Sequence, residues 1–372
     1  MTSVAQERAL RDRGAFLGAT LAHVPTPALL LGGDALDHNL ATMDTQFASM
    51  PSGLRPHVKA HKCPEIARRQ VAAGAVGVAT ATVWEAIAMA EAGIADVLVA
   101  NQVVGAPKVE SLLSISASTR ITVAVDDAGN VADLSDAAVA ARRELEILVE
   151  LDIGQERCGV RTREAALRLA EQVSAAPGLR LRGMQGYEGH CMLEPDPDTR
   201  GRLARAAIAQ LVDAVDHLEG AGLSCEDVSA GGTGTYFITG ANPRVTEVQA
   251  GSYALMDAFH GDLVPGGFRT ALTVLTTVIS RQGRTIVLDA GRKAIGVDFA
   301  LPRVVGHDTA TVRFVAEEHT LLDFPASPPL GIGDQVELVA GYGPTTVNLH
   351  EAFLVVRHGT VDDVWPIEAR GR

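Results

Sequence analysis

The sequence predicts an α/β protein, built as a (β/α)8 TIM barrel followed by a C-terminal β domain. Eight strand candidates alternate with Ala-rich amphipathic segments, which is the pattern of a closed parallel barrel. Hydrophobic residues make up 47% of the chain and aromatic residues only 4%, as expected for parallel strands buried under helices. A length of 372 residues leaves room for such a barrel and a smaller domain.

The elements follow in order from the N-terminus. A polar segment, which we expect to be mobile or helical, precedes an apolar strand at Thr26–Leu31. Apolar residues at helical spacing predict a helix over 35–48. The eight barrel strands are expected at Arg55–Lys59, Val76–Thr80, Asp96–Asn101, Arg120–Val125, Glu146–Asp152, Leu181–Tyr187, Glu226–Ala230 and Val245–Gly251. Segments such as Thr82–Ala92 and Arg163–Ala175 are the helices between them. A doubly wound sheet of similar length has a similar number of alternating strands and helices, and we favour the barrel.

Beyond residue 265 the composition changes, and Val, Thr and Gly occur in short runs of alternating apolar and polar residues. Strands are predicted at Thr285–Leu288, Thr311–Val315, Gln335–Ala340 and Ala352–Arg357. This part of the chain is therefore expected to form a β domain.

The net charge of −13 argues against nucleic acid or an anionic membrane as a partner. The first eight residues carry charges and no apolar run, so we expect no signal peptide and a soluble, cytoplasmic protein. The four cysteines are far apart, which predicts reduced thiols. An anionic small molecule would need a local positive site.

Lys59 is the first candidate for chemistry. Within the stretch Leu54–Lys62 we predict a short strand that ends at Lys59. The C-terminal ends of strands in α/β proteins face the ligand. A partly desolvated lysine loses its proton and attacks carbonyls, including the aldehyde of pyridoxal 5′-phosphate. The alternative is a solvated cationic loop of Lys59, His61 and Lys62.

Two glycine-rich turns follow the seventh and eighth predicted strands, where TIM barrels often hold phosphate. The first is Ser229–Tyr236, and the second is Gln249–Tyr253. Glycines let backbone N–H groups approach an anion, and Thr233, Thr235 and Ser252 add hydroxyl donors. Either turn alone could be purely structural, but together they predict an anion site opposite Lys59.

Three further residues follow the fifth and sixth predicted strands. Arg157 would lie over the barrel mouth, where a guanidinium near a pyridine nitrogen keeps it unprotonated; a salt bridge with Glu156 or Asp152 is the alternative. Tyr187 is a candidate cofactor contact. His190 could move a proton at neutral pH, or be an ordinary loop histidine.

An ordered set of motifs now identifies a family resemblance. The motifs are Thr26-Pro27-Ala28, Arg55-Pro56-His57-Val58-Lys59-Ala60-His61-Lys62, Ala81-Thr82-Val83 with Glu85-Ala86, Arg157-Cys158-Gly159-Val160, Gly231-Gly232-Thr233-Gly234-Thr235 and Gln249-Ala250-Gly251-Ser252-Tyr253. Over nearly the whole chain they resemble the D-threonine aldolase family. That family includes 3-hydroxy-D-aspartate aldolase and D-serine dehydratase, and it is related to alanine racemase.

The resemblance implies an alanine racemase-like, pyridoxal-phosphate-binding barrel at 32–262, a β domain formed by 1–31 and 263–372, and a homodimer. It implies that the strand at Thr26–Leu31 joins the β domain. Lys59 would be the Schiff-base lysine, and Arg157 would face the pyridine nitrogen. The phosphate would be held by Gly232, Thr233, Gly234, Gly251, Ser252 and Tyr253.

One departure concerns the metal site implied by the family. Members usually carry His-x-Asp or His-x-Cys before a Pro-Thr-Val-Asn-Leu-like run, and these side chains bind a divalent ion. Here Tyr342 and Pro344 stand in those places, before Thr345-Thr346-Val347-Asn348-Leu349. A proline side chain cannot be a ligand, so we expect the usual metal site to be lost. Substitute ligands from His190, His350 or Glu188 find no support in their spacing.

The leading hypothesis is a pyridoxal-phosphate lyase that cleaves Cα–Cβ of a D-β-hydroxy-α-amino acid. His190 or Tyr342 would take the β-hydroxyl proton without a metal. Racemisation or epimerisation using Lys59 and Tyr342 is the alternative, and β-elimination of the D-serine dehydratase kind is the third. A carrier that binds the cofactor without turnover is disfavoured. Such carriers consist of a barrel alone, whereas this chain is predicted to have a β domain as well.

Overall fold

The computed structural model describes residues 14–264 and 267–371. The chain divides into two compact units. Among the described residues, the barrel unit contains Met43–Lys59 and Ile66–Gly251, and the β unit contains residues 14–42, Ala60–Glu65, 252–264 and 267–371. The predicted domain bounds of 32–262, 1–31 and 263–372 are not tested by this division and stay a prediction.

The barrel unit is built on an eight-stranded sheet, in which every paired strand runs parallel to its neighbour. The strands are β2 (Gly53–Leu54), β3 (Val78–Thr80), β4 (Asp96–Gln102), β5 (Arg120–Val125), β6 (Leu145–Glu150), β7 (Leu179–Gln185), β8 (Asp227–Ala230) and β9 (Glu247–Val248), in the order β2-β9-β8-β7-β6-β5-β4-β3. A parallel bridge between His57 and Ala79 joins the two ends of this order. The Ala79 N–H also donates to the Pro56 carbonyl at 2.9 Å. These links close the sheet, as expected for a (β/α)8 barrel.

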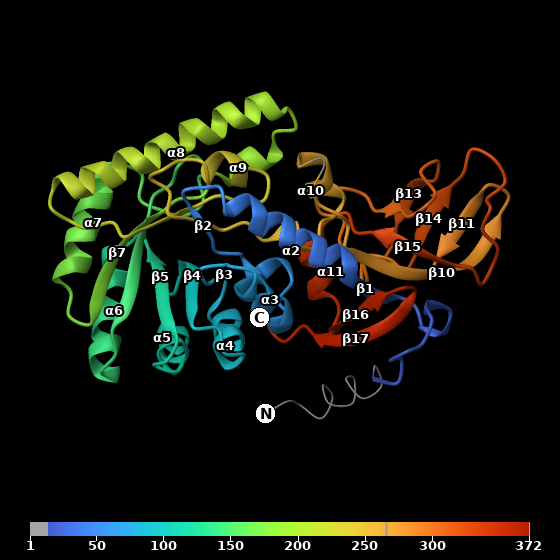
Figure 1. The fold of residues 1–372 in the computed structure, drawn as a ribbon, viewed down its shortest axis with the longest axis horizontal. Coiled ribbons are helices and arrows are strands. Elements are labelled where there is room, and N and C mark those ends of the chain that lie inside the picture. Colours follow the sequence, from blue (N-terminus) through green and yellow to red (C-terminus); the bar gives the residue numbers. More distant parts are fainter. Residues whose placement is uncertain (1–13, 265–266, 372) are drawn as a thin grey trace. The chain divides into compact units, whose positions relative to one another are not determined.

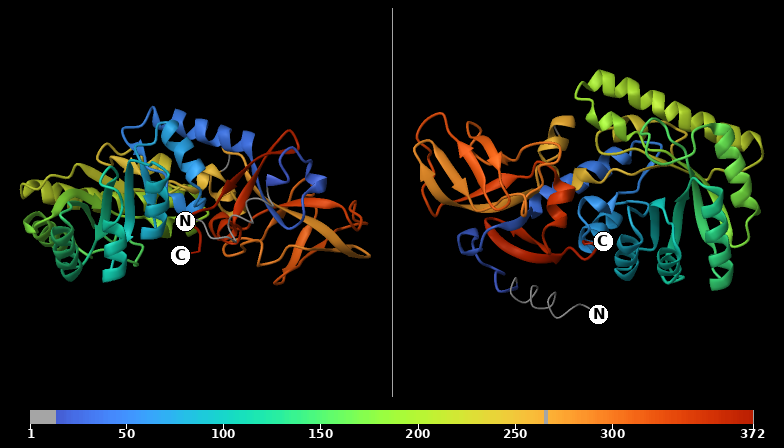
Figure 2. Two further views of the ribbon diagram at one scale, coloured as in Figure 1. Left: turned by 90° about the horizontal axis from the view of Figure 1, so that it is seen from below. Right: turned by 180° about the vertical axis from the view of Figure 1, so that it is seen from behind.

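Helices follow the strands and pack on the outside of the sheet. They are α3 (Pro64–Ala72), α4 (Val83–Glu91), α5 (Ala106–Leu113), α6 (Ala128–Ala141), α7 (Arg163–Ala175), α8 (Pro197–Gly220) and α9 (Tyr236–Thr239). Figure 1 shows α4, α5 and α6 side by side along the strands, and Figure 2 shows the same row from behind. Their starts follow local rules, because the Thr162 hydroxyl accepts the Ala165 N–H at 3.1 Å and Asp196 accepts the Thr199 N–H at 2.8 Å.

The β unit holds a nine-stranded, mostly antiparallel sheet. Its strands are β1 (Ala28–Gly32), β10 (Leu272–Gln282), β11 (Thr285–Leu288), β12 (Arg303–Val304), β13 (Thr311–Val315), β14 (Thr320–Asp323), β15 (Gln335–Val339), β16 (Ala352–Arg357) and β17 (Thr360–Pro366). Strand β1 pairs antiparallel with β10 and parallel with β16, which confirms that the N-terminal strand joins this domain. Buried Leu30, Leu275 and Leu354 pack together in its core. The unit also contains η1 (Leu21–His23), most of α2 (Gly33–Phe47), η4 (Ser252–Ala254), α10 (Ala258–Leu263) and α11 (Gly343–Asn348).

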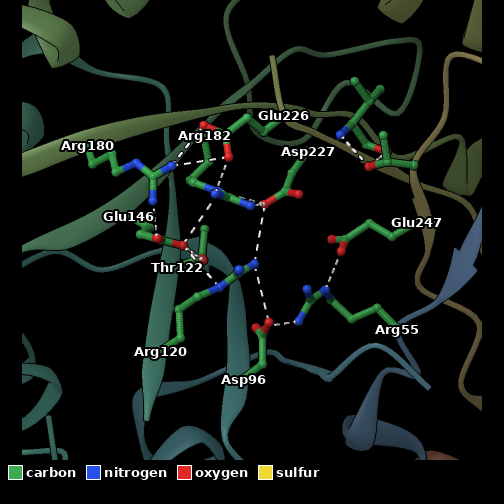
Figure 3. A network of polar contacts seen from close by, with 12 residues as sticks. Arg55, Asp96, Arg120, Thr122, Glu146, Arg180, Arg182, Glu226, Asp227 and Glu247 are labelled. Carbon is green, nitrogen blue, oxygen red and sulfur yellow. Dashed lines mark hydrogen bonds and ion pairs between the residues drawn. The ribbon is translucent and has the colours of Figure 1, made fainter. Parts of the chain in front are cut away.

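The inside of the barrel is charged near the N-terminal ends of its strands (Figure 3). Arg55 donates to Glu247 at 2.6 Å and to Asp96 at 2.8 Å. Arg120 continues the network between Asp96 at 3.2 Å and Glu146 at 3.1 Å. Arg180, Arg182, Glu226 and Asp227 complete it. In TIM barrels this end is associated with stability, and the opposite end carries the chemistry.

Most predicted elements are found within two residues of their expected bounds, and helix α7 and strands β5, β11, β13 and β16 match them. The strand predicted at Arg55–Lys59 is wrong, because the regular strand ends at Leu54. Pro56 has no N–H for the ladder, and Lys59 lies in the 3-10 helix η2 (Val58–Ala60). No helix in the described residues is long and apolar enough to span a membrane. The expectation for the first thirteen residues lies outside the described part of the chain.

Candidate active site

Lys59 lies where the chain leaves the barrel wall. Its side chain is half-buried, and its Nζ is 5.8 Å from the centroid of the Tyr187 ring. Burial lowers the pKa of Lys59, the Arg157 guanidinium lowers it further, and the Glu85 carboxylate opposes both. A lowered pKa increases the fraction of neutral amine near pH 7, which is the nucleophilic form.

The Tyr187 ring brings Lys59 and Arg157 together. The Arg157 Cζ is 5.8 Å from the same ring centroid, so both cations lie within the usual range of ring contacts. The suggested salt bridge with Asp152 does not form, since Asp152 pairs with Arg161 and accepts the Gly154 N–H at 3.0 Å. The structure thus places Arg157 beside Tyr187.

The two glycine turns approach this group of residues closely. A Cβ at Gly232 would lie 3.2 Å from Tyr187 Cε2, and one at Gly251 would lie 2.3 Å from the His57 carbonyl oxygen. Gly231 has φ of +86°, a conformation that favours glycine. Thr233 in the same turn is buried. The first turn therefore touches Tyr187, and the second touches the loop that carries Lys59.

Glu188 holds the first turn from the neighbouring strand end. Its carboxylate is fully buried and accepts the Gly231 N–H at 3.1 Å, the Thr235 hydroxyl at 2.7 Å and the Thr239 hydroxyl at 2.5 Å. Sequence reasoning mentioned Glu188 only as an unsupported metal ligand. An acid directly after Tyr187 at a strand end was the available signal.

His190 lies in η3 (Gly189–Leu193) after β7, packed against the loop that follows β6. A Cβ at Gly154 would lie 2.8 Å from its Cε1. Its Nδ1 is buried without a hydrogen-bond partner in the part of the chain that the structure describes, and its Nε2 is 3.6 Å from Cys191 Sγ. Gln155 Oε1 likewise has no partner there, and it is close to Gly189. Unsatisfied buried groups are uncommon, and a bound ligand can supply their partners.

Glu85 belongs to the family motif Ala81-Thr82-Val83 with Glu85-Ala86, and the sequence assigns it no role. It starts α4 together with Thr82, whose hydroxyl accepts the Glu85 N–H at 3.2 Å. The Glu85 carboxylate is buried and accepts the Ala81 N–H at 2.6 Å. This resembles a capping box, which fixes the charge that acts on Lys59.

A belt of polar side chains crosses the barrel interior at the C-terminal strand ends. Glu150 accepts the amides of Gln102 at 2.6 Å and Gln185 at 3.1 Å. Gln249 donates to Ser229 at 2.9 Å. Burial raises the pKa of Glu150, and its two amide donors oppose this. The belt gives the barrel interior a polar layer below the loops that carry Arg157 and Tyr187.

Tyr342 belongs to the β unit, at the start of α11. Its ring stacks on His260 with centroids 5.8 Å apart and meets Phe299 edge to face at 4.7 Å. Asp257 fixes this cluster, because it accepts from His260 Nδ1 at 2.8 Å and from the Gly343 N–H at 2.7 Å. Burial, with the nearby charges of Asp257 and Asp298, raises the pKa of Tyr342 to about 12.

Pro344 and His350 are not placed to hold a metal. Pro344 is in the first turn of α11, and His350 Nε2 is 2.7 Å from the Ala294 carbonyl oxygen. Across the described ranges, no three or more His, Cys, Asp or Glu side chains are arranged to hold a metal ion. Ser252 and Tyr253 lie in η4, directly after Gly251 in the chain, and Tyr253 is buried.

Comparisons with known proteins place the chain in a family. Residues 32–258 match the model of the alanine racemase N-terminal domain, and residues 271–356 match a putative serine dehydratase domain. The chain is 37% identical to D-threonine aldolase of Arthrobacter sp over 359 residues, covering 95% of each chain. It is 38% identical to 3-hydroxy-D-aspartate aldolase of Paracoccus denitrificans, covering 97% of this chain and 96% of the relative.

A solved structure shows the same arrangement of the fold. The D-threonine aldolase of Filomicrobium marinum aligns with a TM-score of 0.91 and 40% identity, over 95% of this chain and 98% of that one. The predicted alanine racemase-like fold is therefore confirmed. Together with the position of Lys59, these matches show that the chain belongs to the family of D-threonine aldolases and 3-hydroxy-D-aspartate aldolases, within the proteins that share the alanine racemase N-terminal domain.

Proposed function

We propose that the protein is a pyridoxal-phosphate-dependent lyase that cleaves the Cα–Cβ bond of a D-β-hydroxy-α-amino acid. The observation that carries the proposal is a lysine of lowered pKa beside Tyr187 and Arg157. The names of the relatives support the D configuration and the β-hydroxyl group.

The residues present fit pyridoxal 5′-phosphate. Lys59 offers an amine for its aldehyde, and Gly232 lacks the Cβ that would crowd Tyr187. Thr233, Gly234, Gly251, Ser252 and Tyr253 are the residues we propose for the phosphate, because their turns provide N–H and hydroxyl donors. When bound, this cofactor supplies an electron sink next to Cα of the attached amino acid.

The chain's own residues supply the remaining chemistry. Lys59 would hold the cofactor through its neutral amine, and the nearby positive charge of Arg157 increases the neutral fraction of that amine. We propose that Arg157 would hold the pyridine nitrogen of the cofactor unprotonated and that Tyr187 would contact the cofactor. A base must remove the β-hydroxyl proton, and His190, with its unpartnered Nδ1, is the better candidate. Tyr342 is the weaker base, because a pKa of about 12 keeps its phenol protonated at neutral pH.

We further propose that this reaction runs without the family's usual metal. The replaced donors support this, since Pro344 has no ligating atom in its side chain and the raised pKa of Tyr342 keeps its phenol protonated at neutral pH. Racemisation through Lys59 and Tyr342 would also require Tyr342 to act as a base in one direction, which the same raised pKa disfavours. We also propose that the protein is a homodimer. Light scattering after gel filtration tests this oligomeric state.

The test is incubation of the purified protein with D-threonine, D-phenylserine and D-3-hydroxyaspartate, with their L isomers as controls. We expect aldehyde release or glyoxylate formation from D isomers only, unchanged by a chelator. No carbon–carbon cleavage of any D-β-hydroxy amino acid would refute the proposed reaction. A 2-oxo acid with release of ammonia would indicate β-elimination, and Cα deuterium exchange with inversion would indicate racemisation.

A further inference from the structure

Two consecutive residues after β7 hold the first glycine turn, Gly231–Thr235, from its barrel side. Tyr187 packs on Gly232, where a Cβ would lie 3.2 Å from the ring. Glu188 is fully buried and binds the turn through its carboxylate. No function proposed so far uses the Glu188 side chain.

We propose that Glu188 is a positioning residue that sets the conformation of the Gly231–Thr235 turn for binding a phosphate group. The inference rests on the proposed function, in which this turn takes the phosphate of pyridoxal phosphate. Glu188 itself does not touch the phosphate in this proposal; it acts on the backbone that does.

The hydrogen bonds show how the carboxylate controls the turn. Oε2 accepts the Gly231 N–H at 3.1 Å, at the residue with φ of +86°. Oε1 accepts the Thr235 hydroxyl at 2.7 Å, and that hydroxyl accepts the Gly232 N–H at 3.3 Å. Oε1 also accepts the Thr239 hydroxyl at 2.5 Å, at the end of α9. The first, second and fifth residues of the turn are thus tied to one side chain.

A carboxylate suits this position because it only accepts hydrogen bonds, and three donors converge on it. In Glu188→Gln, one of the two acceptor oxygens becomes an NH2 donor, so the hydrogen bonds from Gly231, Thr235 and Thr239 cannot all keep their present direction. The charge has the opposite effect, since a carboxylate near an anion site repels the anion. If Glu188 acts by setting the conformation of the turn, Glu188→Gln weakens phosphate binding. If its negative charge dominates, the same substitution strengthens phosphate binding.

The experiment compares pyridoxal 5′-phosphate with pyridoxal, which lacks the phosphate. The cofactor is removed from the purified protein, and both compounds are titrated back while absorbance of the bound cofactor is followed. We expect Glu188→Gln to weaken binding of pyridoxal phosphate about tenfold, from loss of a buried hydrogen bond. Pyridoxal affinity should change much less, so the ratio of the two affinities reports the phosphate turn.

A second variant leaves every charge in place. Thr239→Val removes one donor to Glu188 and should lower the same ratio by a smaller factor. The matched control is Thr122→Val, which removes a buried threonine hydroxyl 3.4 Å from the Glu146 carboxylate, in the charged network at the other end of the barrel. It should leave the ratio unchanged. Circular dichroism and thermal unfolding establish that each variant is folded.

Equal or tighter binding of pyridoxal phosphate by Glu188→Gln overturns the inference, and so does an equal loss for both compounds. If Glu188→Gln does not fold, an unchanged ratio in Thr239→Val overturns it. These results leave the proposed function intact when the wild-type protein binds pyridoxal phosphate. A wild-type protein that does not bind it overturns the proposed function, and the inference with it.

Discussion

Replacement of Arg55 by methionine is expected to destabilise the barrel strongly. Arg55 is only 3% exposed and donates to Glu247 at 2.6 Å and Asp96 at 2.8 Å. Burial by itself disfavours its charge, but the carboxylates of Glu247 and Asp96 together raise the pKa of Arg55 above its usual value. Methionine keeps much of the side-chain volume and removes the cation.

The magnitude follows from what the two carboxylates retain. Asp96 still has Arg120 at 3.2 Å, so its loss is partial. Glu247 is 4% exposed, and among the residues that the structure describes Arg55 is its ion-pair partner. Leaving one buried charge unpaired costs about 3–5 kcal/mol of the free energy of unfolding. Replacing both partners, in Arg55→Met with Glu247→Met, should recover much of that loss.

The assay is urea unfolding followed by fluorescence, since Trp84 lies in α4 of the barrel unit. Arg313→Met is the matched control, because the Arg313–Asp323 ion pair lies at the surface. The Arg313 side chain is 52% exposed and the Asp323 side chain is 38% exposed. An exposed pair contributes only about 0–1 kcal/mol. If Arg55→Met lost no more than Arg313→Met, the reasoning about the charged barrel interior would be refuted.

Four further outcomes test the proposed site. Borohydride treatment should fix a pyridoxyl group on Lys59, seen by peptide mass, and Lys59→Ala should bind no cofactor covalently; a pyridoxyl group elsewhere would contradict this. Arg157→Gln removes a cation that lowers the pKa of Lys59, so the pH dependence of covalent cofactor attachment should shift to higher pH; a shift to lower pH would be the wrong sign. His190→Gln should reduce aldehyde release by roughly 10²–10⁴-fold with cofactor binding retained, as for loss of a general base. Tyr342→Phe should retain most activity; if it instead abolishes activity while His190→Gln does not, Tyr342 moves the proton.

The order of the elements could be predicted because it depends on local patterns. Short apolar runs such as β6 mark the buried strands, Ala-rich amphipathic segments mark the helices between them, and capping residues such as Thr162 mark helix starts. Lys59 and the glycine turns could be identified because few other residue types perform their chemistry. The strand at Arg55–Lys59 was mispredicted, because its end depends on how Pro56 meets the neighbouring strand.

Contacts between distant segments were beyond the sequence. The distance from Glu188 to Thr235 and Thr239 is set by how β7 and β8 pair, and no local pattern encodes it. The pKa of Lys59 depends on burial and on Arg157 and Glu85, which lie far away in the chain. The raised pKa of Tyr342 likewise comes from the rings and carboxylates packed around it.

The amino-acid sequence alone therefore determined the class of fold, the lysine and the family resemblance, because each depends on residue types at short spacing. The tertiary structure alone decided which charges and hydrogen bonds surround those residues. Electrostatic effects and hydrogen bonds act over a few ångströms in space, and only the closed barrel brings the ends of its strands that near.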